Sequence, residues 1–524
     1  MNFRLEKIKA LPILVALLLG LVLIPFIYLL FRAGEKSIPE AVDLLLRAKT
    51  LEVLATTTAL LALVVIINVL LGTLIATGLH FVRIPYSRAL IIPTVLPLAI
   101  PSYVFTYTWM ALIPALSGLW AAAFILVLTT LPYMILAVLI SLRQLDSGLI
   151  EVARSLGLTK PAIFFRVVLP QIRSSISAGA LLSGLYVMSD YGAVSLLRVD
   201  TLTVTIANMF KSSYDRGAAA VISLLLVLAS LIFVSADQLI KGRSISDNAS
   251  KRSSVKNTRL SSPSLRVATL TLTLTYALLS VLIPFSVLIS RFIGNPNPID
   301  YQRLLAAATS TILVSAIGAV MALAIAIPLA ILTAQGPGRF AQFSERVILV
   351  GHALPGVVIG LALVSLGVHL GALYQSIFLL AFAYALLFLA KAVAATTQAL
   401  QLVPPVLREV AATLGKNRTS VTASVVFPIA LPSIGLGALL VFLTAMKELP
   451  ATIMLRPTGM DTLATQIWSY ASISRFNDAA PYALLLVLIA AIPTFLLTLP
   501  PAERGNQAEI DSMSSTAQKM REPV

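Results

Sequence analysis

Apolar runs near or beyond the roughly 20 residues that cross a membrane's hydrocarbon core recur along the whole length of this chain. The first extends from Leu11 to Phe31 and follows a short basic segment. Because no small-residue cleavage site comes after it, we expect this run to be retained as a helix and not removed as a signal peptide. Backbone groups inside hydrocarbon must be paired within the protein, and helices do this within one segment. The chain is therefore expected to be an all-α polytopic membrane protein.

The composition excludes an ordinary soluble domain. Only 11% of the residues are charged and 58% are hydrophobic, whereas soluble domains carry about 25% charged residues. The formal net charge of +16 would suggest a nucleic-acid partner in a soluble protein. Here, however, Lys and Arg gather in loops that are expected to stay in the cytoplasm. Cysteine is absent, which excludes disulfides, thiolate metal ligands and cysteine nucleophiles.

About twelve spans are expected, divided between two halves. They lie near residues 11–31, 52–79, 89–113, 119–142, 177–197, 218–240, 267–290, 306–333, 347–368, 372–395, 433–455 and 479–500. The division is a first transmembrane domain at 50–240 preceded by helix 11–31, a cytoplasmic basic linker at 241–265, a second transmembrane domain at 266–500 with its core at about 304–498, and a cytoplasmic polar tail at 501–524. The excess of Lys and Arg in the linker predicts that both termini lie on the cytoplasmic side of the membrane.

Two polar loops between apolar segments repeat one another 258 positions apart. Glu151 corresponds to Glu409, since 409 − 151 = 258, and Gly157 corresponds to Gly415 at the same offset. Each loop is expected to form a short helix that the glycine ends in the left-handed conformation, followed by a second short helix. Two such loops on the same side of the membrane indicate two docking sites for a partner outside it.

The residues two positions after these glutamates are small, Ala153 and Ala411. We expect them to leave a helix face with little side chain, which a partner's surface could approach closely. An ordinary interfacial helix would explain one such loop equally well. The second copy, at matched spacing, favours the docking interpretation.

The repeat continues into the spans and predicts a pathway between the halves. Asp190 matches Glu448 and Pro97 matches Pro355, since 448 − 190 and 355 − 97 both equal 258. An even number of spans in each half makes the repeat parallel, about an axis along the membrane normal, with a pathway expected between its copies. Ionisable side chains within spans usually face a bundle interior or a wet cavity. Asp190 and Glu448 are therefore candidate pathway or gate residues. Pro97 and Pro355 are candidates as well, because a proline breaks backbone pairing, which a span tolerates beside a cavity or neighbouring helices.

Two lysines, Lys391 and Lys447, also fall within predicted spans. Because Lys447 adjoins Glu448, the alternative is that the side chains of Lys447 and Glu448 reach the interface or pair with a neighbouring helix. Beyond residue 198 a short insertion shifts the register, so that Leu202 corresponds to Leu463.

The patterned loops resemble the signature of the permease subunits of type I importers of the ATP-binding-cassette (ABC) class. That signature is Glu-Ala-Ala, three residues, Gly, nine residues, then Ile-x-Leu-Pro. The first loop fits at Glu151, Ala153, Gly157, Val167, Leu169 and Pro170, and the second at Glu409, Ala411, Gly415, Val425 and Pro428. The departures are mild and apolar: valine for the first alanine and for isoleucine in both copies, and Phe427 for leucine.

The resemblance implies that each loop forms a coupling helix on a cytoplasmic ATPase, with Glu151, Ala153, Gly157, Glu409, Ala411 and Gly415 at the contact. It also implies two ATPase copies that bind ATP-Mg, an extracytoplasmic solute-binding protein, and no cofactor or enzymatic activity in this chain. The sequence contains no GxxxxGK[ST] phosphate loop, as expected if the ATPase is a separate chain.

The residues 96–103 and 446–452 are similar to those of the fused, double-length permeases of ferric iron importers, and fusion of both halves supports that subgroup. Fused permeases for thiamine, or a permease for polyamines, are the alternatives within the class. An ion-coupled secondary transporter and a membrane scaffold are the alternatives outside it. We expect no stable metal site, because tight binding would prevent release and the three histidines are scattered without ligand spacing.

Overall fold

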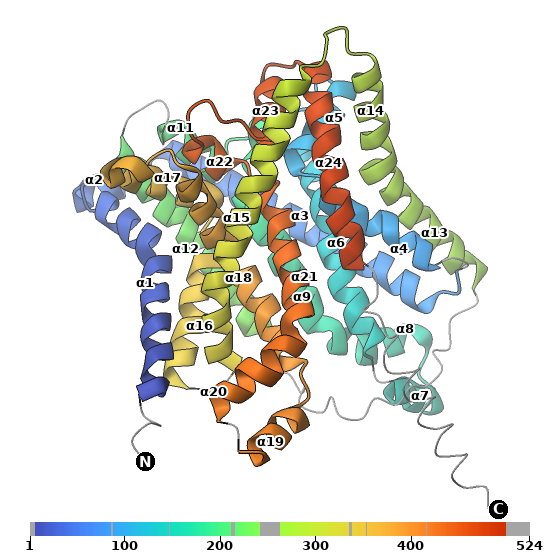
Figure 1. Ribbon diagram of the computed structural model, residues 1–524. Coiled ribbons are helices and arrows are strands. Elements are labelled where there is room, and N and C mark those ends of the chain that lie inside the picture. Colours follow the sequence, from blue (N-terminus) through green and yellow to red (C-terminus); the bar gives the residue numbers. More distant parts are fainter. Residues whose placement is uncertain are drawn as a thin grey trace, which may run out of the picture.

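The computed structural model describes residues 6–84, 87–145, 147–210, 215–241, 262–334, 338–352, 354–415 and 417–498 (Figure 1). Within these ranges the regular elements are helices, which confirms the prediction of an all-α polytopic membrane protein. The predicted linker and tail fall almost wholly on residues 242–261 and 499–524, outside the described ranges.

The described residues of the first half form twelve α-helices. They are α1 (Glu6–Ala33), α2 (Ile38–Leu46), α3 (Ala48–Phe81), α4 (Ser87–Val95), α5 (Ser102–Leu112), α6 (Leu119–Arg143), α7 (Ser147–Ser155), α8 (Lys160–Ile163), α9 (Leu169–Ser189), α10 (Gly192–Leu196), α11 (Leu202–Asn208) and α12 (Arg216–Lys241). A 3₁₀ turn at Leu96–Ala99 precedes α5, and a π-helical turn at Phe164–Val168 joins α8 to α9.

The second half follows the same order. Its helices are α13 (Pro263–Ala277), α14 (Ile283–Ile293), α15 (Tyr301–Ala334), α16 (Arg339–His352), α17 (Gly356–Gly367), α18 (Ile377–Gln401), α19 (Pro405–Thr413), α20 (Arg418–Val421), α21 (Phe427–Ala445), α22 (Pro450–Leu455), α23 (Leu463–Ser472) and α24 (Phe476–Thr498). π-Helical turns at Leu278–Leu282 and Thr422–Val426 join α13 to α14 and α20 to α21, and a 3₁₀ turn at Val368–Leu373 extends α17.

Nine helical segments in the described ranges are long and apolar enough to cross a membrane, and ten are if one bent pair is counted as a span. The bent pair, Ala89–Ala99 with Ser102–Leu112, turns by 96° within the predicted span 89–113. The predicted span 177–197 is also interrupted, because α9 ends at Ser189 and α10 begins at Gly192. The sequence pattern therefore located the apolar segments but did not reveal these breaks.

The structural repeat has three registers, one more than the two expected from the sequence. Helices α6 and α18 are offset by 258 at both ends (377 − 119 and 401 − 143). In α3 and α15, however, Thr57 and Thr311 accept equivalent hydrogen bonds, from the backbone N–H groups of Leu202 (3.0 Å) and Leu463 (2.9 Å). Thr57 and Thr311 are 254 positions apart, whereas Leu202 and Leu463 are 261 positions apart. The latter offset confirms the predicted insertion after residue 198.

The first helix of each half packs on the other half. Helix α1 contacts α15, α16 and α17, while α13 and α14 contact α3, α4 and α5. The hydroxyl of Tyr276 in α13 donates to the carbonyl of Leu128 in α6 at 3.0 Å. The Arg291 guanidinium of α14 donates to the Ala111 carbonyl of α5 at 2.7 Å. The halves are thus interlocked and form one bundle.

Short helices gather at the two ends of this bundle (Figure 1). Helices α7 and α19, which carry the two patterned loops, lie at the end where α1 begins. Helix α2 lies at the opposite end, where Lys36 forms an ion pair of 2.8 Å with Asp215. The chain therefore exposes both repeated loops on one side of the long helices.

The packing of α15 on α18 is the most extensive helix contact of the bundle, and it requires a small residue at Gly318. A Cβ atom there would lie 2.8 Å from the Tyr384 Cβ and 3.2 Å from the Ala381 carbonyl oxygen. Gly435 in α21 is instead exposed, with nothing within 4 Å of such an atom.

We predict that Gly318→Val destabilises the protein by about 1–3 kcal/mol, because overpacked helices must separate. The matched change Gly435→Val introduces the same side chain on an open face and should have a much smaller effect. Thermal unfolding in detergent measures both. Equal melting temperatures for the two variants would contradict the packing described for α15 and α18.

Candidate functional site

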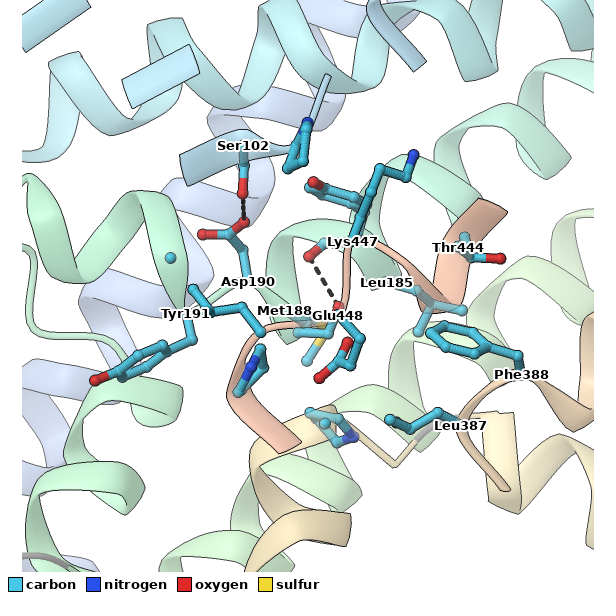
Figure 2. A pocket seen from close by; sticks show the side chains of 18 of the residues that line it. Ser102, Leu185, Met188, Asp190, Tyr191, Leu387, Phe388, Thr444, Lys447 and Glu448 are labelled. Carbon is cyan, nitrogen blue, oxygen red and sulfur yellow. Dashed lines mark hydrogen bonds between the residues drawn. The ribbon is translucent and has the colours of Figure 1, made fainter. Parts of the chain in front are cut away.

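A cavity of about 190 Å³ lies between the two halves (Figure 2). The first half contributes residues from the start of α5 and from the end of α9, and the second half contributes residues of α18 and of the end of α21. Asp190, Glu448 and Pro355 of the predicted pathway residues line this cavity, together with both lysines of the predicted spans.

Asp190 follows the last residue of α9 and caps the next helix. Its Oδ1 accepts hydrogen bonds from the backbone N–H groups of Ala193 (2.9 Å) and Val194 (3.4 Å) at the start of α10. Its Oδ2 accepts a hydrogen bond from the hydroxyl of Ser102, the first residue of α5. Figure 2 shows the Ser102 side chain directed at this carboxylate. Both carboxylate oxygens are therefore engaged by the protein.

Glu448 plays the corresponding part in the second half. Its Oε1 accepts a hydrogen bond of 3.0 Å from the backbone N–H of Ala451, in the first turn of α22. The side chain of Thr452 donates to the Glu448 carbonyl at 2.7 Å. The residue that faces this carboxylate from α17 is Gly356, where a Cβ atom would lie 2.6 Å from Oε1. A glycine thus replaces the serine that holds Asp190.

The proline that matches Pro355 in space is Pro101, and not Pro97. Pro101 and Pro355 directly precede α5 and α17, with φ/ψ angles of −65°/153° and −67°/156°, and both line the cavity. Pro97 lies in the 3₁₀ turn before them, is buried, and is not among the residues that line this cavity. The sequence analysis paired Pro97 with Pro355 because it applied the offset of 258 to this region as well. The two halves differ in length here, so that offset does not hold. From Pro355 to Ile377 are 22 positions (377 − 355), against 18 from Pro101 to Leu119 (119 − 101).

Both lysines of the cavity contact the surrounding protein without an acidic partner. The Lys447 ammonium donates to the backbone carbonyl of Leu98 at 2.5 Å, across the boundary between the halves. The Lys391 ammonium lies 5.4 Å from the centre of the Phe388 ring. Among the described residues neither lysine forms an ion pair with a carboxylate. The adjacent Lys447 and Glu448 therefore belong to one cavity but do not neutralise each other directly.

Sequence reasoning missed hydroxyl groups that line the cavity, among them those of Ser102, Tyr103, Tyr133 and Tyr186. The hydroxyl of Tyr103 is buried and has no hydrogen-bond partner in the described structure. A signal was available for Tyr133, because it corresponds to Lys391 at the offset of 258 (391 − 133). Tyrosines are common in membrane helices, however, so their chemistry alone did not distinguish these three.

No group of three or more His, Cys, Asp or Glu residues within the described ranges is placed to hold a metal ion. His80 packs edge-on against the neighbouring Phe81 ring, with centroids 4.7 Å apart. The expectation that the chain has no stable metal site stays a prediction.

The patterned loops fold as expected, into two short helices separated by a glycine. Gly157 and Gly415 have φ angles of 77° and 80°, in the left-handed region where glycine lacks the steric penalty of other residues. In the first loop the N–H of Leu158 donates to the carbonyl of Ala153 at 3.1 Å, which closes the helix end.

The two alanines of these loops face inward, contrary to the expectation that they form the approach face. Ala153 and Ala411 are only 5% and 6% exposed. Ala411 belongs to a buried cluster with Val421 and Val426 of the following helix. Their small size lets α7 and α19 lie close to the protein's own helices, so a partner would contact a different face.

Each loop helix instead exposes an apolar face beside exposed polar residues such as Arg154 and Thr413. This face consists of Leu149, Val152 and Leu156 in the first copy and Leu407, Val410 and Leu414 in the second. Leu156 and Leu414 are 75% and 77% exposed. Each residue of one set lies 258 positions from its counterpart, and the spacing of three and seven positions aligns the set along one helix face. Glu151, Gly157, Glu409 and Gly415 are exposed beside these faces.

Comparison with known proteins gives matches across both halves. Residues 68–245 and 326–500 each match the family model described as the binding-protein-dependent transport system inner membrane component. The Fe(3+)-transport system permease protein FbpB 2 of Haemophilus influenzae is 30% identical over 493 residues, which cover 92% of this chain and 97% of that protein.

Shorter similarities extend to permeases with other named solutes. The spermidine/putrescine transport system permease protein PotB of Escherichia coli is 34% identical over 116 residues, which are 21% of this chain and 42% of that protein. The chloroplastic sulfate permease 2 of Chlamydomonas reinhardtii is 28% identical over 230 residues, which are 40% of this chain and 62% of that protein.

We predict that Asp190→Ala lowers stability more than Glu448→Ala. Loss of a cap costs about 1 kcal/mol in either case, but only Asp190→Ala also leaves the buried Ser102 hydroxyl without its acceptor, at a further cost of about 1–3 kcal/mol. Asp190→Asn keeps an oxygen for the cap and should cost much less. Thermal unfolding of the three variants in detergent measures this order. An Asn variant as unstable as the Ala variant would contradict the capping role.

Proposed function

This chain belongs to the family of inner membrane components of binding-protein-dependent transport systems, and on that basis we propose that it is the fused permease of a ferric iron importer. Membership makes it the permease subunit of an ABC transporter, a multi-pass membrane protein that works with ATPase and solute-binding partners. The similarity to the named Fe(3+) permease, which spans nearly both chains in full, is the observation that carries the choice of ferric iron.

The cavity supports a small cargo. Its volume of about 190 Å³ is below the roughly 300–1,000 Å³ of sites that enclose drug-sized ligands. A drug-sized solute such as thiamine would require a wider opening between the halves. Carboxylate oxygens, as supplied by Asp190 and Glu448, suit a hard cation. Two carboxylates without further protein ligands give contact with the passing ion and also allow its release.

The exposed apolar faces of α7 and α19 support two ATPase docking sites, one for each copy of the subunit. Covering exposed apolar groups with a partner's surface removes them from water and stabilises the complex. Glu151 and Glu409, with Gly157 and Gly415, flank these faces, while Ala153 and Ala411 hold each loop helix against the body of the permease. ATP-Mg would bind in the partner, so that this chain needs no cofactor and performs no covalent chemistry.

A continuous helical rod links each docking site to the cavity. Helix α8, the π-helical turn and α9 run without a break from Lys160 to Ser189, next to Asp190. The second half repeats this rod from Arg418 to Ala445, close to Glu448. Helices α7 and α19 contact the π-helical turns of these rods. Closure of the two ATPases would therefore tilt both rods and turn the cavity from the outer to the inner side, with Asp190 and Glu448, and with Pro355 beside them, as the gate.

The charges of the loops support cytoplasmic termini and a binding protein on the opposite face. On that face, next to α2, the hydrogen bond between Lys36 and Asp215 raises the pKa of Lys36 and lowers the pKa of Asp215. Both side chains therefore stay charged at neutral pH and tie the segment before α2 to the start of α12. The solute-binding protein would dock on this outer face.

We predict that the permease, reconstituted in liposomes with its ATPase and its solute-binding protein, accumulates ferric iron only when ATP is hydrolysed. Thiamine and spermidine, each offered with the same assembly, should not accumulate. Radioactive uptake measures all three solutes. Uptake of iron that is driven by a proton gradient without ATP would instead identify an ion-coupled secondary transporter.

We predict that Leu156→Ser together with Leu414→Ser weakens ATPase binding about tenfold or more, because two apolar contacts at the interface centres are lost. The control Ile38→Ser alters a residue of α2 that is 81% exposed at the other end of the bundle. Affinity of the purified permease for the ATPase measures both. The docking assignment fails if the double variant and the control bind equally well.

A further inference from the structure

The ionisable groups that line the central cavity sum to no net charge. Asp190 and Glu448 contribute two carboxylates, and Lys391 and Lys447 contribute two ammonium groups. A pathway built for a bare trivalent cation would be expected to present an excess of negative charge, because like charges raise the energy of the ion. The two lysines are therefore the feature of this cavity that transport of bare iron does not explain.

Few carboxylate oxygens remain for a metal. Asp190 uses one oxygen for the N–H groups at the start of α10 and the other for Ser102. Glu448 uses Oε1 for Ala451, and its Oε2 accepts no hydrogen bond from the described residues. Because the described part of the chain brings no third acidic or histidine ligand to the cavity, most of the ligands around a passing ferric ion must travel with it.

The lysines have donors to spare. An ammonium group carries three N–H donors. Lys447 gives one of them to the Leu98 carbonyl. Lys391 forms no hydrogen bond within the described structure and rests on the Phe388 ring. Lys447, Glu448 and Asp190 line the same cavity, so a bound group could reach both kinds of charge.

Hydroxyl groups add further hydrogen-bond donors to the lining of this cavity. Tyr103, Tyr133 and Tyr186 line the same cavity, and the Tyr103 hydroxyl has no partner in the described structure. Ammonium and phenol groups together are the donors that a small oxyanion accepts from. A cation alone would leave all of these donors unused.

The lysines also break the symmetry between the halves. Lys391 corresponds to Tyr133 and Lys447 corresponds to Ser189, both at the offset of 258 (391 − 133 and 447 − 189). Both ammonium groups thus come from the second half, at positions where the first half has neutral hydroxyls. An arrangement of this kind suits a cargo with two chemically different ends.

We propose that the cavity takes ferric iron as a complex with a small oxyanion, with Glu448 facing the metal and with Lys391 and Lys447 binding the oxyanion. This inference rests on the proposed transport of ferric iron. The volume of about 190 Å³ equals roughly six water molecules at about 30 Å³ each. It accommodates an ion with a few ligands, and the oxyanion is either an inorganic phosphate or a small carboxylate.

The test uses the full transporter in liposomes with its ATPase and its solute-binding protein. The binding protein is loaded either with radioactive iron and labelled phosphate or with radioactive iron and labelled citrate. We expect one labelled anion to accumulate in the liposomes in step with iron. Accumulation with phosphate or with citrate identifies the source of the oxyanion. Accumulation of iron while both labels stay outside overturns the inference but leaves the proposed ferric importer intact.

Variants then test the two lysines. Lys391→Gln and Lys447→Gln should each lower uptake of iron and of the anion in parallel, by about tenfold, because a hydrogen bond from a charged donor is lost. Lys391→Arg keeps the charge and should retain most of the uptake. The control Lys49→Gln makes the same chemical change at an exposed site that is not part of this cavity. Glutamine variants that transport both labels like the control would overturn the assignment to these lysines.

An assembly whose ATPase is stimulated by its solute-binding protein, but which accumulates no iron with any anion, contradicts the proposed ferric cargo itself. That result is distinct from iron uptake without an anion, which contradicts only the co-transport inference. The two failures therefore have separate readouts in one experiment.

Discussion

Both halves interrupt a long helix beside the cavity, and a membrane interior tolerates such a break only where other protein groups or water satisfy the freed backbone groups. Asp190 does this at the junction of α9 and α10, and Glu448 does it at the junction of α21 and α22. The same two carboxylates line the cavity between the halves. The residues that make the broken backbone stable are thus also the acidic groups that a passing cation would meet.

The break gives each half a lever with a defined end. From Lys160 to Ser189, and from Arg418 to Ala445, the chain is one helical rod that includes a π-helical turn. The patterned loop helices contact these turns through buried alanines, while their leucines and valines remain exposed. An event at the exposed apolar face can therefore reach the cavity through packed helix without passing through a flexible loop. The crossed packing of α1 on the second half, and of α13 and α14 on the first, keeps the two rods in one assembly.

Fusion of the halves allows them to differ where they meet. Ser102 fixes Asp190, whereas Gly356 leaves Glu448 with only its backbone partner. Lys391 and Lys447 occupy the positions that correspond to Tyr133 and Ser189 of the other copy. Two identical subunits could not arrange these groups, because any lysine of one copy would recur in the other. The cavity therefore combines a symmetric pair of caps with an asymmetric set of donors.

The sequence by itself determined the features that depend on neighbours along the chain. The apolar runs set the helical class, Gly157 and Gly415 set the ends of the loop helices, and the spacing of 258 paired Asp190 with Glu448. Only the tertiary structure decided which faces are covered, because burial depends on helices that are distant in the sequence. It turned Ala153 and Ala411 inward and exposed the leucines beside them. It paired Pro101 with Pro355, because the segment from the proline to the start of α18 is four residues longer than the segment from the proline to the start of α6 (22 − 18). It also placed Asp190 of the first half in one cavity with Lys391, Lys447 and Glu448 of the second half, a meeting that no local pattern encodes.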